Sequence, residues 1–197
     1  YENRLKPFTL SMGVNYNYKY IKNSYQGDAS SLTNTDNNRL YGFAEIKGSL
    51  RQLRYSLGVG ASYIHYTQNG HRYNFWTFHP KASLTYNISN NVQLSYTCQM
   101  QDKVSRIAMT SDAMIRTNSM EWTVGNPDLK PSHDMEHHLQ VSYNNNRLQT
   151  FLNGYFKQCF KPNMAHYERT DDNHFVYTQT NQKEIDALNV MAYAGYW

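Results

Sequence analysis

A strict alternation of apolar and polar residues between Phe8 and Ile21 constrains the fold of this chain more than any other feature. One set of positions holds Phe8, Leu10, Met12, Val14, Tyr16, Tyr18 and Tyr20, and the positions between them hold Thr9, Ser11, Gly13, Asn15, Asn17 and Lys19. Successive side chains of a strand point to opposite faces, so this pattern predicts a strand with one apolar face. Soluble strands usually have about 5–6 residues, whereas a tilted membrane strand needs about 9–11. The length therefore favours a membrane strand, and its tyrosines fit an aromatic girdle.

The composition excludes a helical protein. Tyrosine is abundant, with 18 of 197 residues, whereas leucine and alanine, which favour helices, are scarce. No run approaches the roughly 18 consecutive apolar residues of a membrane helix. The polar average would usually indicate a soluble protein, but in an outer-membrane barrel only alternate residues face lipid, so the average hides the pattern.

The alternation recurs along the rest of the chain. It covers residues 39–49, 53–63, 76–86, 92–100, 135–143, 148–157, 174–181 and 185–197, with the last two segments expected to pair. Together with the first segment, this predicts about nine strands. Pro80 conflicts with a closed sheet because it has no N–H for the ladder, so we expect a bulge there.

The connections between these segments differ at the two ends of the strands. Long or middling ones cover 22–38, 68–72, 101–132 and 161–173, and tight ones cover 51–52, 87–91 and 144–146. Outer-membrane barrels have short periplasmic turns and long outer loops, whereas a Greek-key sandwich has no reason for this difference. The sequence thus predicts an all-β, antiparallel up-and-down transmembrane β-barrel. Nine is odd, and Tyr1 does not begin a signal peptide, so we expect residues 1–197 to be a partial barrel domain.

A proline-bounded segment, Val124 to Pro131, precedes the strand at 135–143. Gly125 and Asn126 tolerate unusual backbone angles, while Pro127 and Pro131 fix φ and disfavour helix, so the segment is expected to be rigid and extended. Its residues Gly125, Asn126, Pro127, Leu129, Lys130 and Pro131 resemble the barrel signature of TonB-dependent outer-membrane receptors. Residues 78–81 and 93–96 also look like that family. These motif residues shape the backbone and offer little chemistry, so we expect a structural role.

The resemblance implies a function for the whole protein. Family members form barrels of about 22 strands with an N-terminal plug in the lumen, so it implies that the plug and the N-terminal strands are absent here. It implies a part of a transporter in the Gram-negative outer membrane for active uptake of a nutrient, which is an iron chelate, a glycan, a peptide or a vitamin. The implied partners are outer-membrane lipid, the TonB energy transducer through the absent plug region and, for a glycan importer, a surface lipoprotein lid over residues 101–132.

The remaining residues predict no catalytic, cofactor or metal site. The rings of His137 and His138 should point to opposite faces of a strand, and the other histidines lack the spacing of zinc ligands. No nucleophile elbow is present, and basic residues are scattered, which disfavours nucleic acid. Cys98 and Cys159 are expected on opposite faces two strands apart, and therefore free, whereas Glu45 and Lys47 share a polar face and are expected to pair. We expect that the chain is not an enzyme.

The alternative is a soluble all-β carbohydrate-binding or adhesion module. Aromatic residues interleaved with polar ones suit the stacking of sugar rings, although they suit a barrel girdle or wall equally: Tyr41, Phe43, Tyr73, Phe75 and Tyr155. A small β-rich hydrolase is a weaker reading, since no catalytic constellation can be drawn. The module predicts that the apolar faces pack against each other in a dry core, and the barrel predicts that they face lipid.

Overall fold

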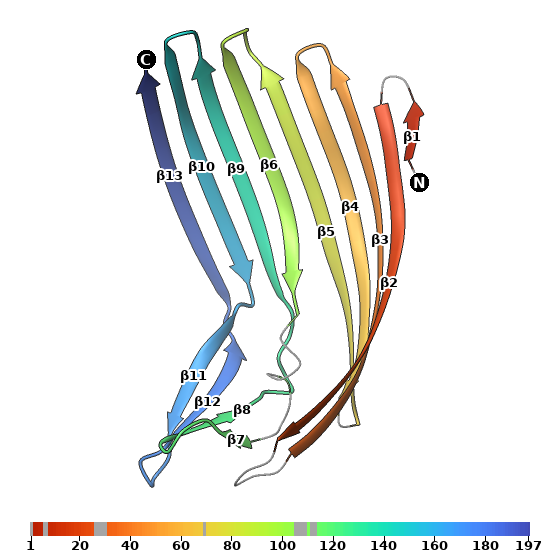
Figure 1. The fold of residues 1–197 in the computed structure, drawn as a ribbon, viewed down its shortest axis with the longest axis vertical. Coiled ribbons are helices and arrows are strands. Elements are labelled where there is room, and N and C mark those ends of the chain that lie inside the picture. Colours follow the sequence, from red (N-terminus) through yellow and green to blue (C-terminus); the bar gives the residue numbers. More distant parts are fainter. Residues whose placement is uncertain (1, 6–7, 26–30, 69, 105–109, 111–113) are drawn as a thin grey trace.

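Two β-sheets make up the structure, a computed structural model that describes residues 2–5, 8–25, 31–68, 70–104, 110 and 114–197 (Figure 1). The large sheet has nine antiparallel strands in the order β1-β2-β3-β4-β5-β6-β9-β10-β13. They are β1 (Glu2–Leu5), β2 (Phe8–Tyr25), β3 (Ser31–Leu50), β4 (Leu53–Gln68), β5 (His71–Asn87), β6 (Val92–Lys103), β9 (Ser132–Asn144), β10 (Leu148–Phe160) and β13 (Glu184–Tyr196). This confirms the antiparallel up-and-down arrangement.

A small sheet with the order β11-β12-β8-β7 lies at one end of the large one. Its strands are β7 (Met114–Arg116), β8 (Glu121–Val124), β11 (Asn163–Arg169) and β12 (Phe175–Asn181). The tight turns at 51–52, 88–91 and 145–147 lie at the opposite end of the large sheet. The two ends of the strands therefore differ as expected. Within the part of the chain that the structure describes, no helix is long and apolar enough to cross a bilayer.

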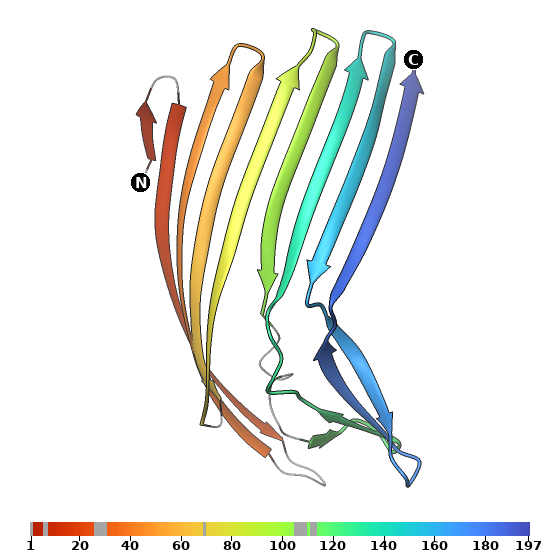
Figure 2. The same ribbon diagram turned by 180° about the vertical axis from the view of Figure 1, so that it is seen from behind.

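The strand register collects the apolar rows on one face of the large sheet, which we call the outer face. Tyr16 pairs with Leu40, Leu40 with Tyr63, and Tyr63 with Trp76, and each pair shares a face. Trp76 is 73% exposed, and Figure 2, which views the sheet from behind, shows its strands as a single layer. Apart from two prolines, Ile64, Tyr66 and Leu129 are the only buried apolar side chains among the described residues. The dry core that the soluble module requires is therefore not present in the described residues.

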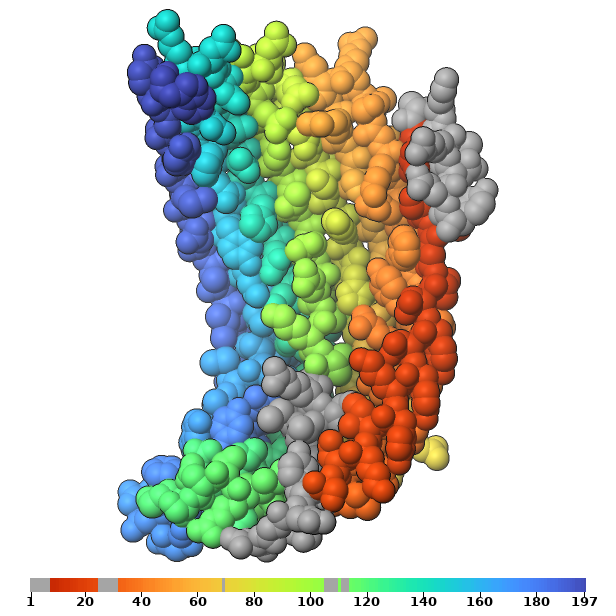
Figure 3. All heavy atoms as spheres, viewed as in Figure 1, coloured from red at the N-terminus to blue at the C-terminus, as the bar shows by residue number. Residues whose placement is uncertain are grey.

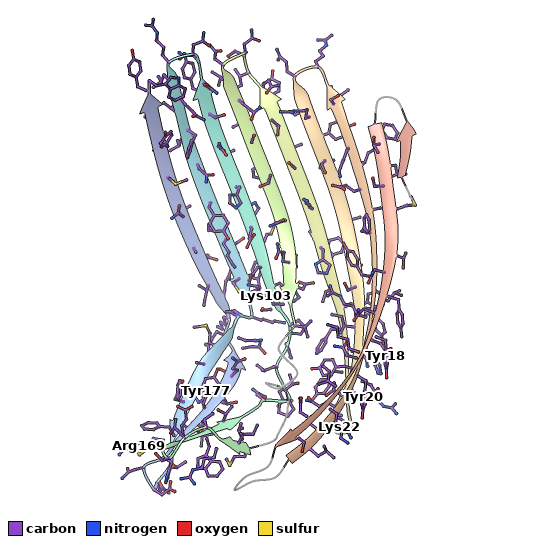
Figure 4. All side chains as sticks on the ribbon, in the orientation of Figure 1. Tyr18, Tyr20, Lys22, Lys103, Arg169 and Tyr177 are labelled. Atoms are coloured by element: carbon purple, nitrogen blue, oxygen red, sulfur yellow. The ribbon has the colours of Figure 1, made fainter. Side chains whose placement is uncertain are left out.

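Aromatic residues border the outer face on the side of the long connections. Their hydroxyls donate to polar residues farther from the tight turns, Tyr16 to Asn38 at 2.7 Å, Tyr18 to Asp36 at 2.8 Å and Tyr63 to Asn74 at 3.0 Å. The rings of Tyr63 and Trp76 are 5.0 Å apart, and Figure 4 shows Tyr18 and Tyr20 along the outer side of β2. An apolar ring with a hydrogen-bonded polar tip suits the boundary between hydrocarbon and water.

The apolar row of β4 has about the height of the apolar band of an outer-membrane barrel. On β4 the outer row runs from Leu53 to Tyr63, beyond which His65 and Thr67 are polar. At about 3.3 Å per residue this row is about 33 Å long. Strands of outer-membrane barrels tilt by about 35–45°, so the row spans about 25 Å of height, which matches the apolar band of such barrels.

The expectation of a loop over 22–38 was largely wrong. β2 and β3 stay paired to their ends, with Ile21–Tyr25 opposite Ser31–Thr35. The polar residues that suggested a loop are strand residues beyond the aromatic border, where a strand needs no apolar row. Thr33 and Thr35 are buried there, at 2% and 0% exposure.

The expected bulge at Pro80 was also wrong. The ladder between β4 and β5 is continuous from Leu53↔Tyr86 to Gln68↔His71, and it includes Val59↔Pro80. On the other side, the ladder between β5 and β6 ends at Lys81↔Gln99. Pro80 is thus the first residue beyond that ladder, where β5 needs no donor toward β6.

The expected pairing of 174–181 with 185–197 was wrong as well. β13 pairs with β10, and β12 pairs with β11 and, in parallel, with β8. The segments 101–132 and 161–173, expected as loops, contain β7, β8 and β11. The large sheet has nine strands, which is the predicted number, but its members differ from the prediction. It includes β1, which was not predicted, and lacks β12, which belongs to the small sheet.

Candidate functional site

The concave face of the large sheet is hollowed between its two edges (Figure 3). A groove of about 780 Å³ lies on it, within the range of small-molecule sites. Its polar lining is Asn15, Asn17 and Lys19 from β2, Asn37, Arg39 and Glu45 from β3, His79 and Lys81 from β5, and Gln99 and Gln101 from β6. These are the positions that alternate with the apolar rows, so the same period that makes the outer face produces this groove.

Aromatic rings lie flat on the wall of the groove because glycines leave room for them. A Cβ atom on Gly60 would come within 2.6 Å of the Tyr41 hydroxyl, and one on Gly13 within 2.6 Å of the Phe43 ring. The two rings stack with centroids 5.9 Å apart, and Tyr41 also meets His79 edge-on at 5.9 Å. Tyr41 and Phe43 are therefore wall residues of the concave face and not girdle residues.

A buried carboxylate holds three strands together at the end of the concave face. Oδ2 of Asp134 accepts hydrogen bonds from Nζ of Lys103 at 2.5 Å and from Nζ of Lys157 at 2.8 Å. The Asp134 side chain is 1% exposed, and Lys157 also lies 3.7 Å from Glu136. Figure 4 places Lys103 where the strands give way to the long connections. The two ammonium groups compensate the buried charge and link β6, β9 and β10.

The residues of the predicted family motif lie at the base of the small sheet, and none of them lines the groove. Gly125, Leu129 and Pro131 are buried. The Asn126 amide donates to the Gln179 carbonyl at 2.9 Å, and the N–H of Lys130 donates to Asn181 at 2.8 Å. Pro127 lies between these two contacts. The motif therefore fastens the connection from β8 to β9 onto the end of β12.

Asn181 is the centre of this attachment, and no sequence pattern indicated this role. Its amide nitrogen donates to the carbonyls of Lys130 at 3.0 Å and Lys161 at 2.9 Å, and it also contacts Asn163. The Asn181 side chain thus joins the connection between β8 and β9 to the connection between β10 and β11. Asparagine is common in turns, so its type alone did not distinguish it from the many other asparagines.

The opposite facing of His137 and His138 and the free state of Cys98 and Cys159 agree with the predictions. His137 stacks beside Tyr96 and Phe156, and His138 packs on Tyr155 from the opposite face. Both cysteines are free. Lys47 pairs with Glu45 at 2.9 Å, as expected. Among the residues with described positions, no three of His, Cys, Asp and Glu come together as a metal site.

Comparison with known proteins agrees with this architecture. Residues 2–186 match the family model described as "TonB dependent receptor-like, beta-barrel". Nothing among the curated proteins matches the chain.

Three solved structures share the fold at low sequence identity. The FrpB iron transporter from Neisseria meningitidis (F3-3 variant) has a TM-score of 0.70 at 12% identity and covers 100% of this chain and 32% of its own. The copper transporter OprC has a TM-score of 0.69 at 12% sequence identity, and the match covers 99% of this chain and 34% of OprC. A mutant ferric enterobactin receptor (PfeA) from Pseudomonas aeruginosa has a TM-score of 0.68 at 13% sequence identity, and the match covers 94% of this chain and 30% of the receptor. This chain spans about a third of the length of these structures.

Proposed function

Because this chain belongs to the TonB-dependent receptor-like β-barrel family, we propose that it forms part of the wall of a transporter in the Gram-negative outer membrane. The two faces of the nine-stranded sheet carry this proposal. One face presents apolar side chains bordered by hydrogen-bonded tyrosines, and the other is polar and hollowed. In a bilayer, strands must satisfy their backbone groups with each other, which a closed sheet achieves.

The whole protein would take up a nutrient through the lumen that this wall surrounds. The proposed substrate is an iron chelate, a glycan, a peptide or a vitamin. Among the similar structures, FrpB is named an iron transporter, OprC a copper transporter and PfeA a ferric enterobactin receptor. In this proposal the plug and the N-terminal strands belong to other parts of the protein, and the plug couples to the TonB energy transducer. A surface lipoprotein lid over residues 101–132 is the partner proposed for a glycan importer.

The motif from Gly125 to Pro131 has a structural role in this proposal. It carries the chain from the small sheet into β9 and fixes the small sheet through Asn126 and Lys130. Its buried glycine, leucine and proline leave little surface for a solute. The connection between β6 and β9, which contains the motif, and the connection between β10 and β13 would receive solute at the outer end.

Uptake by the intact receptor tests the proposal. The receptor is produced in a Gram-negative host with and without the TonB transducer, and accumulation of radiolabelled iron chelates, glycans, peptides and vitamins is measured. We expect the receptor in the outer-membrane fraction and accumulation of one solute class only when both receptor and transducer are present. A receptor recovered from a soluble fraction, or accumulation that is equal without the transducer, would contradict the proposal.

A further inference from the structure

The cations of the concave face fall into two groups. Lys47, Lys103 and Lys157 each lie within 4 Å of a carboxylate, that of Glu45 or Asp134. Lys19, Arg39, Lys81 and Arg54 do not, among the residues that the structure describes. The first three line the groove described above, and all three are exposed. Arg54 lies beside the tight turn at 51–52, outside the groove lining.

The groove also contains a carboxylate, Glu45, but that group is already engaged. It is bound by Lys47 at 2.9 Å and by the Ser56 hydroxyl at 2.6 Å. Arg39 is held in place by the Ser62 hydroxyl, to which Nε donates at 3.4 Å and one terminal nitrogen donates at 3.2 Å. The remaining N–H groups of its terminal nitrogens are available. The groove thus has an excess of positive charge that the described residues do not compensate.

We propose that this groove is an anion-binding subsite, and that Lys19, Arg39 and Lys81 select a solute that carries carboxylate, phosphate or sulfate groups. A cleft lined by one sign of charge concentrates counter-ions, and an arginine binds such groups with two parallel hydrogen bonds. The amides of Asn15 and Asn17 supply donors and acceptors for hydroxyl or amide groups of the same solute. This inference rests on the proposed function, since it names the chemistry of the solute that the lumen admits.

Binding of citrate to the intact receptor in detergent tests the subsite. Citrate is a hydroxylated tricarboxylate, and sorbitol serves as the uncharged probe. Isothermal titration is carried out on the native receptor and on the variants Lys81→Gln, Arg39→Gln and the double variant. We expect saturable citrate binding that weakens as salt rises, no binding of sorbitol, and a Kd about 10-fold or more higher in the double variant.

Two further variants separate charge from folding. Arg39→Lys keeps the positive charge and should retain most of the binding. Arg54→Gln removes an exposed cation of the same face that lies outside the groove lining, and it should leave the Kd unchanged. The inference is overturned if the native receptor binds no citrate, if the double variant binds as tightly as the native protein, or if Arg54→Gln weakens binding equally. A receptor that resides in the membrane and transports solute yet gives any of these results would leave the proposed function intact.

Discussion

Asp102 lies opposite Phe78, and its side chain takes the place of a backbone acceptor there. The strand ladder between β5 and β6 has ended at Lys81↔Gln99, and the Phe78 N–H donates to Oδ2 of Asp102 at 2.9 Å. His133 hydrogen-bonds the same carboxylate, and His79 lies 3.9 Å from it. The Asp102 side chain is 1% exposed, so a buried carboxylate closes the sheet where its backbone bonds stop.

Removing this carboxylate should weaken the sheet. Asp102→Ala removes the charged acceptor of the Phe78 N–H and the partner of His133, and the loss of a hydrogen bond to a charged group costs about 1.5–3 kcal/mol. Urea unfolding of the intact receptor in detergent, followed by tyrosine and tryptophan fluorescence, measures the loss. Asp128→Ala, which removes an exposed carboxylate, is the control and should change stability by less than about 0.5 kcal/mol. Equal stability of both variants would show that Asp102 does not hold the strands together.

Asn181 should determine how firmly the two long connections hold each other. Asn181→Ala removes donors to the Lys130 and Lys161 carbonyls and the acceptor of the Lys130 N–H. A loss of about 1.4 kcal/mol in local stability corresponds to about 10-fold more opening, hence about 10-fold faster hydrogen exchange of the backbone N–H groups of Lys130 and Lys161. In Gln182→Ala, an exposed neighbour, this exchange should be unchanged. Exchange at the native rate in Asn181→Ala would contradict the joint attachment.

Glycines of the large sheet should differ in tolerance according to what lies above them. A Cβ on Gly60 would meet Tyr41 at 2.6 Å, whereas a Cβ on Gly42 has no atom within 4 Å. Gly60→Ala should therefore displace the Tyr41 ring and cost about 1–3 kcal/mol, and Gly42→Ala should be tolerated. In a Tyr41→Ala background the cost of Gly60→Ala should fall below about 1 kcal/mol. The same cost in both backgrounds would mean that the ring does not occupy that space.

A charge on the outer face should cost more than the same charge one residue away. Leu57 lies near the middle of the apolar row of β4, and Ser56 lies on the concave face. Arginine on the lipid face near the bilayer midplane costs about 2–4 kcal/mol, so Leu57→Arg should lose that much stability. Ser56→Arg loses one hydrogen bond to Glu45 and should cost about 1 kcal/mol. Unfolding in lipid vesicles compares the two, and a reversed order would contradict the assignment of the faces.

The alternation of apolar and polar residues predicted the two faces of the sheet, because a period of two determines which residues share a face. The row from Phe8 to Tyr20 and the polar row between its members were both predicted, and the free cysteines followed from them. Strand length was not predictable in the same way. Beyond the aromatic border β2 and β3 continue in polar residues such as Asn34 and Thr35, and these resemble loop residues in composition.

Contacts between distant segments depend on register and could not be read from the chain. Asp102 is an ordinary polar residue after a strand until pairing places it opposite Phe78. Likewise, Arg39 and Lys81 reach one groove only because β3, β4 and β5 pair in a particular register. The pairing of β12 with β8 is parallel and joins two connections far apart in sequence, so local patterns contain no signal for it.

Spin labels at two adjacent residues test the assignment of lipid and solvent most directly. In a receptor whose Cys98 and Cys159 are replaced by serine, labels are placed at Val14→Cys or Asn15→Cys, and the receptor is reconstituted in lipid vesicles. Val14 is 78% exposed on the outer face, and Asn15 lines the groove. We predict that oxygen, which dissolves in lipid, relaxes the label at 14, and that a water-soluble nickel chelate relaxes the label at 15. A label at 14 that the nickel chelate reaches as readily as the label at 15 would contradict a wall between lipid and an aqueous lumen.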